Sequence, residues 1–298
     1  MIRAMKIRPW PKDLFEPATR SMFLFAHQDD EAAYGGLIQR VSPASQFLWV
    51  TNGDGLAREA GMDAREYAAA RRLETEAAMH ALGVEGRRLR FLGHSEVEIY
   101  QALVRVAREP ERRHEVFGMF RSILAQVTAE VRAFRPDVVF TLAWQGGHPE
   151  HDLTHLFARL AIRDRPEVRL FELPEYELAW TVLLRFPPWR RAEVHELRLT
   201  PDEAARKRAA LALYPTQERL LRQFERLLAL RGLVEKAVSL GREDLGVLER
   251  EYFAPVPAER DYTQCPHGLD RLEYLGDDCD GVRISFRRMI APIVQALC

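Results

Sequence analysis

The chain has 298 residues, enough for one large α/β domain with its own hydrophobic core. Its 43 lysine and arginine residues nearly balance 44 aspartate and glutamate residues, so the formal net charge of −1 gives no basic excess for nucleic-acid binding. No apolar run approaches the roughly 18 residues of a membrane span, and the N-terminus lacks the apolar core of a signal peptide. We therefore expect neither a membrane span nor secretion.

The first half of the chain alternates short apolar runs with helical patterns. Four short apolar runs are typical of buried strands: 22–26, 46–51, 89–93 and 138–143. Three stretches have helical patterns: about 31–41, 64–82 and 117–134. Strands that alternate with helices predict a Rossmann-like α/β fold, with a mostly parallel sheet and helices on both faces.

The pattern changes in the second half of the chain. A helix is expected at about 153–162, strands at 169–177 and 194–200, and helices at about 201–213 and 217–240. The last 45 residues are rich in proline and glycine and predict a mostly irregular wrap. We expect a single domain over 1–298, with its core at about 20–200 and a helical and irregular C-terminal α+β extension over 201–298.

The cysteine residues are odd in number and widely spaced: Cys265, Cys279 and Cys298. This usage predicts reduced thiols and a cytoplasmic protein. A zinc knuckle formed by Cys265, His267 and Cys279 is conceivable, but it would lack the paired close spacing of structural zinc sites.

A polar cluster with the sequence Ala-His-Gln-Asp-Asp-Glu occupies 26–31, directly after the first predicted strand. In parallel sheets, ligands bind at the carboxyl ends of the strands. The spacing of His27 and Asp30 can turn an imidazole and a carboxylate, both zinc ligands, toward one point. Asp29 between them is then a candidate general base. Alternatively, the acidic residues only favour the N-terminus of the following helix.

A second polar cluster follows the fourth predicted strand. Residues 144–152 read Trp-Gln-Gly-Gly-His-Pro-Glu-His-Asp, and Pro149 suits the first turn of a helix. His151 can complete a ligand set with His27 and Asp30, and three protein ligands with one open position are the pattern of catalytic zinc sites. Helix capping and ordinary surface placement are the alternatives, but two such clusters at strand ends are less expected by chance than one.

These two clusters resemble the motifs of the PIG-L/LmbE-like zinc-dependent N-deacetylases. The family pattern Ala-His-Pro-Asp-Asp-Glu corresponds to 26–31, and the pattern His-Pro-Asp-His corresponds to 148–151. Weaker features agree, namely the Thr-Asn-Gly turn at 51–53 and the Arg-x-x-Glu helix that ends in Leu-Gly-Val within 71–84. The resemblance covers roughly residues 21–160.

The resemblance implies roles for the clustered side chains. Asp29 would be the general base, and His148 would be the protonated partner that stabilises the oxyanion or protonates the leaving amine. Glu150 takes the place of an aspartate that orients His148, and its arm is one methylene longer. Gln28 replaces the usual proline, which frees the backbone there. One zinc ion per chain would be bound by His27, Asp30 and His151.

Four further residues are candidates for substrate contact. Arg71 falls where the family has a substrate-contacting arginine, although a solvated helix face would explain it equally well. Trp144 could present its aromatic face to a sugar ring or could belong to the core. Asn52 and Asp54 could bind hydroxyl groups or could serve only the turn in which they occur.

The sequence therefore predicts a zinc-dependent hydrolase that removes an acetyl group from an N-acetylated amino sugar or a related small molecule. One alternative is an amidase that acts on a larger N-acyl or thiol conjugate. Another is a non-catalytic Rossmann-like nucleotide- or ligand-binding module, although no G-x-G-x-x-G follows the first predicted strand. A homo-oligomer is compatible with the sequence, and another divalent metal could replace zinc.

Overall fold

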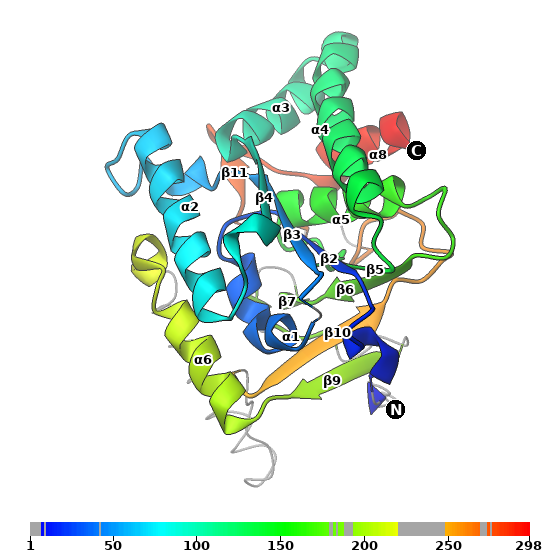
Figure 1. Ribbon diagram of the computed structural model, residues 1–298. Coiled ribbons are helices and arrows are strands. Elements are labelled where there is room, and N and C mark those ends of the chain that lie inside the picture. Colours follow the sequence, from blue (N-terminus) through cyan, green and yellow to red (C-terminus); the bar gives the residue numbers. More distant parts are fainter. Residues whose placement is uncertain are drawn as a thin grey trace, which may run out of the picture.

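The computed structural model describes most of the chain. The described residues are 7–8, 10–41, 43–178, 181–182, 184–187, 193–219, 248–268, 273–274 and 276–298. Figure 1 shows a central sheet with helices packed around it. None of the helices in these ranges combines the length and the apolar character that crossing a bilayer needs.

Eight strands form the central sheet of the described chain, in the order β1-β9-β10-β6-β5-β2-β3-β4. The strands from β6 to β4 in this order pair in parallel, whereas β10 is antiparallel to both β6 and β9. This arrangement confirms the expected mostly parallel α/β class. The strands are β1 (Ile7–Arg8), β2 (Ser21–Phe25), β3 (Gln46–Thr51), β4 (Leu89–His94), β5 (Val138–Leu142), β6 (Arg169–Leu173), β9 (Val194–Arg198) and β10 (Arg250–Pro255).

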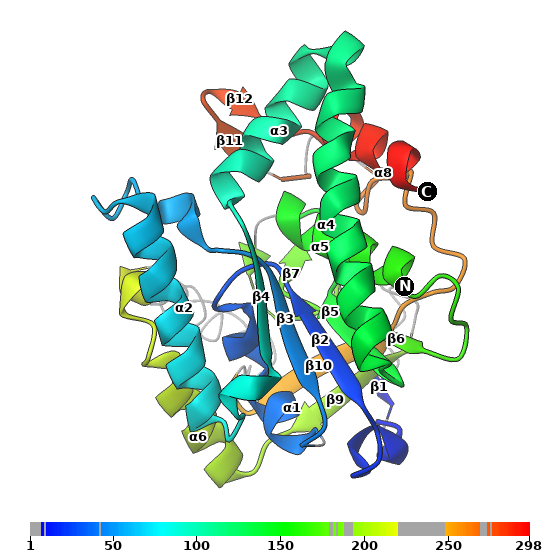
Figure 2. The ribbon, with the colours of Figure 1, turned by 45° about the horizontal axis from the view of Figure 1, so that its top comes forward.

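Helices cover both faces of this sheet. In Figure 2, α2 and α6 lie on one side of the central strands and α4 lies on the other. The helices are α1 (Gly35–Arg40), α2 (Ala64–Ala81), α3 (Glu96–Arg108), α4 (Arg113–Phe134), α5 (Pro149–Ala161), α6 (Pro201–Leu211) and α8 (Ala291–Leu297).

Alternate side chains of β2 enter two different cores. Met22 and Leu24 belong to a cluster that includes residues of α3, α4, α5 and α8. Phe23 and Phe25 belong to a second cluster with residues of α1, α2 and α6. Because both faces are covered, every residue of β2 is buried, which is why the strand is continuously apolar.

Helix boundaries follow local capping chemistry. The Asp63 side chain accepts hydrogen bonds from the backbone N–H groups of Arg65 and Glu66 and so caps α2. The helix ends before Gly83, whose φ of 85° is in the left-handed region that favours glycine. The helix expected at 31–41 is divided into a 3₁₀ turn, Asp30–Tyr34, and the short helix α1.

The second half of the chain contributes more to the sheet than the sequence predicted. Strand β10 lies in the extension expected to be helical and irregular, just before and into the start of the expected wrap, yet it is placed between β6 and β9 in the sheet. Two small antiparallel pairs join β7 (Tyr176–Leu178) to β8 (Thr181–Val182) and β11 (Asp278–Cys279) to β12 (Val282–Arg283). The helix expected at 217–240 falls almost entirely outside the described residues.

Candidate active site

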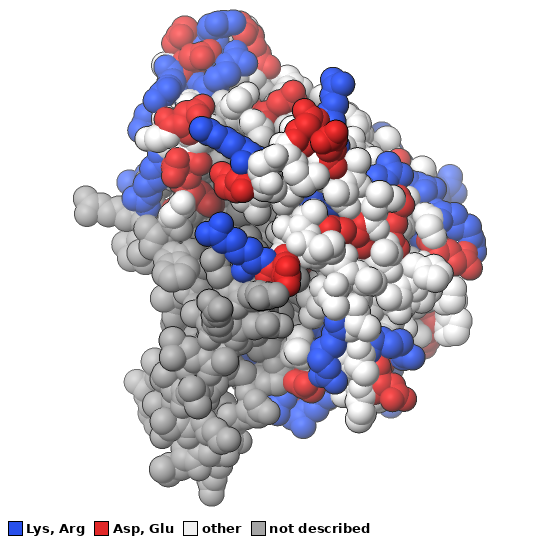
Figure 3. All heavy atoms as spheres, turned by 90° about the vertical axis from the view of Figure 1, so that its left-hand side faces the viewer, with Lys and Arg blue, Asp and Glu red and all other residues white. Residues whose placement is uncertain are grey.

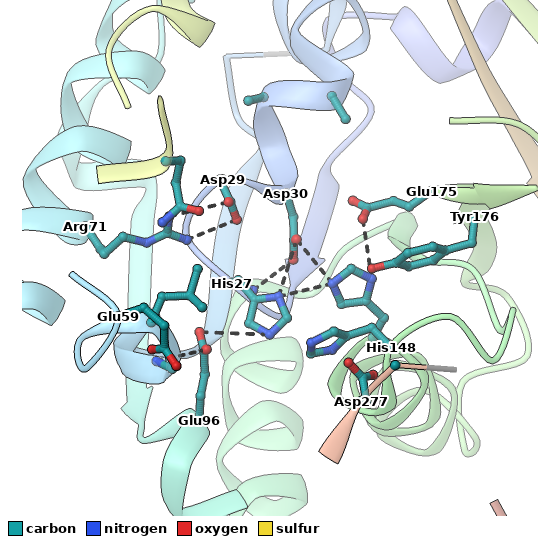
Figure 4. Close-up of a pocket in the computed structure, with 18 of the residues that line it drawn as sticks. His27, Asp29, Asp30, Glu59, Arg71, Glu96, His148, Glu175, Tyr176 and Asp277 are labelled. Atoms are coloured by element: carbon teal, nitrogen blue, oxygen red, sulfur yellow. Dashed lines mark hydrogen bonds and ion pairs between the residues drawn. The ribbon is translucent and has the colours of Figure 1, made fainter. Parts of the chain in front are cut away.

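The two polar clusters meet at one edge of the sheet. Strands β2 and β5 are parallel neighbours, so the loops that follow them lie side by side at their carboxyl ends. These loops border a cavity of about 700 Å³. Figure 4 shows His27, Asp30 and His148 at its centre, with Asp29 and Arg71 to one side.

The expected metal ligands converge on one point. The His151 Nε2 atom lies 3.1 Å from His27 Nδ1 and 3.4 Å from Asp30 Oδ1. His27 Nδ1 and Asp30 Oδ1 are 3.6 Å apart. A tetrahedral zinc ion with bonds of about 2.0–2.1 Å holds its ligand atoms about 3.3–3.5 Å from one another. The three atoms therefore have the spacing that a tetrahedral metal ion requires.

Neighbouring groups turn the ligand atoms toward this point. Asp30 Oδ2 accepts hydrogen bonds of 2.8 Å from the backbone N–H groups of Ala26 and His27, which leaves Oδ1 directed at the centre. The His27 Nε2 atom lies 2.7 Å from Glu150 Oε2, so its N–H donates to that carboxylate. On the far side of His151, Nδ1 lies 3.4 Å from Glu175 Oε2. Carboxylates in these positions fix the histidine tautomers, with a lone pair facing the metal.

Other groupings of the same side chains could also hold a metal ion. Each of them shares His27 or His151 with the set of His27, Asp30 and His151. The groupings among the described residues are His27 with His148 and His151, His27 with Glu96 and Glu150, and Asp30 with His151 and Glu175.

The electrostatics of the centre favour a cation. Burial alone would lower the pKa of His27, but the carboxylates of Glu96 and Asp30 raise it well above its usual value. Burial likewise opposes the ionisation of Asp30, but the charges of His151 and His27 hold its pKa well below the usual value. A buried group of carboxylates that draws positive charge onto an imidazole suits a metal ion.

Asp29 and Arg71 form an ion pair on the wall of the cavity. Arg71 Nη2 lies 3.1 Å from Asp29 Oδ1, and Nη1 donates to Oδ2 over 3.4 Å. The Arg71 side chain is only 4% exposed, whereas that of Asp29 is 27% exposed. Arg71 is thus a buried cavity residue and not part of a solvated helix face.

The structure corrects two expectations about the second cluster. Glu150 contacts His27 and not His148, so its expected role in orienting His148 is wrong. His148 Nε2 instead lies 3.1 Å from the hydroxyl of Tyr100 on α3. Burial, together with the positive charges of His27 and His151, holds the pKa of His148 well below its usual value. These surroundings favour the neutral form of His148, whereas the sequence led us to expect a protonated ring.

Three of the expected substrate-binding residues do not line this cavity. Asp54 accepts hydrogen bonds from the Ser95 hydroxyl and the Glu96 backbone N–H at the start of α3. Asn52 Oδ1 accepts one from the backbone N–H of Asp54 within the turn. Trp144 is buried, and its ring packs edge-to-face against Tyr262 and Phe286. Capping, turn and core roles account for these residues.

The sequence did not indicate several other residues that line the cavity. Glu175 and Tyr176 follow the carboxyl end of β6, so the strand-end rule could have identified them. The Tyr176 ring lies so close to Gly147 that any side chain there would clash with it. Tyr100 lies on a helix that was not predicted, and Asp277 precedes the distant strand β11.

Comparisons with known proteins support this fold. Residues 22–162 match the family model PIG-L, described as GlcNAc-PI de-N-acetylase. A search of curated protein sequences finds no match to the chain. The region matched by the family model contains both polar clusters and therefore all three candidate metal ligands.

Solved structures of deacetylases share the fold at low identity. A deacetylase of the teicoplanin biosynthesis pathway has a TM-score of 0.58 and 18% identity, over 82% of this chain and 100% of that one. The A40926 pseudoaglycone deacetylase Dbv21 has a TM-score of 0.56 and 18% identity, over 82% and 99%. The N,N'-diacetylchitobiose deacetylase from Pyrococcus horikoshii has a TM-score of 0.51 and 20% identity, over 83% and 86%. Residues 22–162 of this chain are thus similar to the PIG-L de-N-acetylases.

Proposed function

We propose that the protein is a zinc-dependent N-deacetylase that releases acetate from an N-acetylated amino sugar or a related small molecule. The observation that carries the proposal is the triangle of ligand atoms from His27, Asp30 and His151, with edges of 3.1–3.6 Å. It lies on a cavity whose volume of about 700 Å³ is in the range of small-molecule sites.

The ligand set favours one zinc ion per chain. Two imidazoles and one carboxylate are the donor types that zinc binds in catalytic sites, where the fourth position stays open. Zinc in such a site supplies Lewis acidity, which polarises an amide carbonyl and activates water near neutral pH. The residues around the site provide the remaining chemistry.

Asp29 is the proposed general base. Its carboxylate lines the cavity next to the ligand Asp30, and the Arg71 guanidinium holds both of its oxygens. An oriented, partly exposed carboxylate can accept the proton of the attacking water. Arg71 also keeps the carboxylate from rotating toward the ligand set, so we assign it a positioning role.

His148 is the proposed proton donor to the leaving nitrogen. Burial favours its neutral form, which can take up the proton that Asp29 removes from water and pass it to the leaving nitrogen. The ring lies against His27, with ring centroids 4.7 Å apart. Tyr100 fixes its orientation through the 3.1 Å contact with Nε2. Since burial raises the pKa of Tyr100 well above its usual value, that hydroxyl stays protonated and donates to the ring.

The substrate class follows from the comparisons and from the cavity. The neighbours with the same fold are deacetylases of teicoplanin biosynthesis, of the A40926 pseudoaglycone and of N,N'-diacetylchitobiose, and the family model is that of a GlcNAc-PI de-N-acetylase. An amidase that acts on a larger conjugate would use the same centre and differ only in the rest of the cavity. The cytoplasmic location and a homo-oligomeric state stay predictions.

Acetate release tests the proposal directly. The protein would be assayed with a panel of N-acetylated amino sugars as purified, after chelation, and after zinc is restored. We expect release by the zinc-loaded protein, loss on chelation and recovery with zinc. Binding of a metal ion without acetate release from any N-acylated sugar or thiol conjugate would contradict the proposal.

A further inference from the structure

The cavity lining contains an excess of acidic over basic side chains. Seven carboxylate side chains line it against only two cationic side chains, so a divalent metal ion at the centre would still leave an excess of carboxylates. On the outer face shown in Figure 3, acidic and basic side chains are interspersed, so the excess belongs to the cavity and not to that face. The carboxylates are Asp29, Asp30, Glu59, Glu96, Glu175, Asp277 and Asp278, and the cations are Arg71 and Lys207.

Both cationic side chains are already engaged. Arg71 is held by Asp29, and its Nε atom is buried. Lys207 Nζ lies 2.8 Å from Glu251 Oε1 and donates to the carbonyl oxygen of Ala33 at 2.6 Å. Within the described lining, no uncompensated cation is therefore left to bind a phosphate or carboxylate of a substrate.

Asp277 differs from the other carboxylates of the lining. It lies beside His148 in Figure 4, and it comes from the region after residue 162, outside the family match. Its Oδ2 atom is buried and has no hydrogen-bond partner among the described residues. A carboxylate so incompletely paired is costly to bury, and a cation brought into the cavity would offset that cost.

The other acidic groups of the lining already have partners or face outward. Asp29 is paired with Arg71, and Asp30 and Glu175 face His27 and His151. Glu96 accepts hydrogen bonds from the Gly55 backbone N–H and the Thr51 hydroxyl. Glu59 and Asp278 are exposed at the rim. Asp277 is thus the carboxylate best placed to meet a charged group of the substrate.

We propose that this cavity selects substrates that carry an ammonium group in addition to the N-acetyl group, and that Asp277 is the residue that recognises it. The inference rests on the proposed function and narrows its substrate class to amino sugars with a second, unacylated amine. Neutral analogues are poorer substrates and phosphorylated ones the poorest, because the lining repels anions.

The test compares three N-acetylated sugars of different charge on the zinc-loaded protein. They are N,N'-diacetylchitobiose, which is neutral; its analogue with a free amine on the reducing unit, which is cationic; and N-acetylglucosamine 6-phosphate, which is anionic. We expect the cationic disaccharide to exceed the neutral one in kcat/KM by about tenfold at low salt, and Asp277→Asn to reduce that ratio to about twofold or less. Asp280→Asn removes the same charge outside the lining and should keep the wild-type ratio.

A binding measurement separates this inference from the proposed function. Calorimetry would compare the fully deacetylated disaccharide with the diacetylated one on the same zinc-loaded protein and on Asp277→Asn. Equal affinities, or a preference that survives Asp277→Asn, would overturn the inference even if acetate is released. A preference that Asp277→Asn abolishes, without acetate release from any sugar, would support the recognition role and contradict the deacetylase.

Discussion

Two ion pairs contribute side chains to the same cavity and have different roles. In the pair of Lys207 and Glu251, the side chains are only 1% and 2% exposed. In the pair of Arg71 and Asp29, the arginine is 4% exposed, but the carboxylate is 27% exposed. Both pairs join a cation to a carboxylate within 3.1 Å, so distance alone does not distinguish them.

The Lys207–Glu251 pair is fully satisfied by the protein. Both oxygens of Glu251 accept backbone N–H groups at the start of α1, from Gly36 at 2.8 Å and from Leu37 at 2.7 Å. The Lys207 ammonium also donates to the carbonyl of Ala33. This pair therefore connects α6, α1 and β10, and its role is structural.

The Arg71–Asp29 pair is incompletely satisfied by the protein. The Arg71 Nε atom has no hydrogen-bond partner among the described residues, and the Asp29 carboxylate faces the cavity. Such groups are costly to keep unless a ligand or a reaction uses them. The comparison suggests that a buried ion pair with all its hydrogen bonds formed is structural, whereas a pair that keeps polar atoms without hydrogen-bond partners is functional.

The largest expected effect is on catalysis, through the incompletely hydrogen-bonded pair of Arg71 and Asp29. Asp29→Asn should lower kcat/KM for acetate release by about 10³-fold, because the proton acceptor is lost. Metal content should not change, and the free energy of unfolding should fall by no more than about 1–2 kcal/mol, because the asparagine oxygen can still accept a hydrogen bond from Arg71 and Glu96 remains as a nearby counter-charge. The exposed Glu76→Gln on α2 serves as a control with the wild-type rate.

The next largest effect is on stability, through the fully hydrogen-bonded pair of Lys207 and Glu251. Glu251→Gln leaves the Lys207 ammonium buried without a counter-charge, so the free energy of unfolding should fall by about 3–5 kcal/mol. Urea denaturation measures it. Glu249→Gln, which breaks an exposed pair with Arg208, should cost only about 0–1 kcal/mol. If Glu251→Gln and Glu249→Gln lowered the free energy of unfolding equally, burial would not explain the difference between the two ion pairs.

A smaller effect, on zinc affinity, is expected at Glu150. This residue is buried like Lys207 and Glu251, but it contacts a candidate metal ligand. Glu150→Gln replaces the carboxyl group that faces His27 Nε2 and should weaken zinc binding by about tenfold, measured with a competing chelator. Unchanged affinity would mean that the contact with His27 is only packing.

The smallest effect concerns the part-exposed pair of Glu203 and Arg40. Hydrogen bonds from Arg40 lower the pKa of Glu203 to about 2, so its contribution is complete above the usual glutamate pKa and is lost as the pH falls toward 2. Glu203→Gln should cost about 1 kcal/mol at pH 7, and the difference should narrow below about pH 4. A difference that is independent of pH would assign the effect to the capping box with Thr200 instead.

The strand-end rule and the two motifs predicted the centre of the site but not its surroundings. His27, Asp30 and His151 could be predicted because parallel strands bring the loops after β2 and β5 together. The partner of Glu150 could not be predicted. Whether this side chain contacts His27 or His148 depends on the reach of the glutamate side chain, which is one methylene longer than that of aspartate. Asp277 gives no local signal because its place in the cavity is set by tertiary packing alone.

The fold was predictable where hydrophobic patterns are continuous. The apolar runs predicted β2, β3, β4 and β5, and Gly83 marked the end of α2. Helix α3 was missed although Ile99, Leu103 and Val106 have helical spacing and are buried. Strand β10 was also missed, because its short apolar pattern lies at the boundary between the expected helix at 217–240 and the expected irregular wrap.

Metal content of three proteins purified side by side tests the central claim most directly. Wild type, Asp29→Asn and His151→Ala would be loaded with zinc, freed of excess metal and measured by elemental analysis. The site described here predicts one zinc per chain in the first two proteins and none in the third. Equal zinc in His151→Ala, or none in wild type, would contradict the metal centre formed by His27, Asp30 and His151.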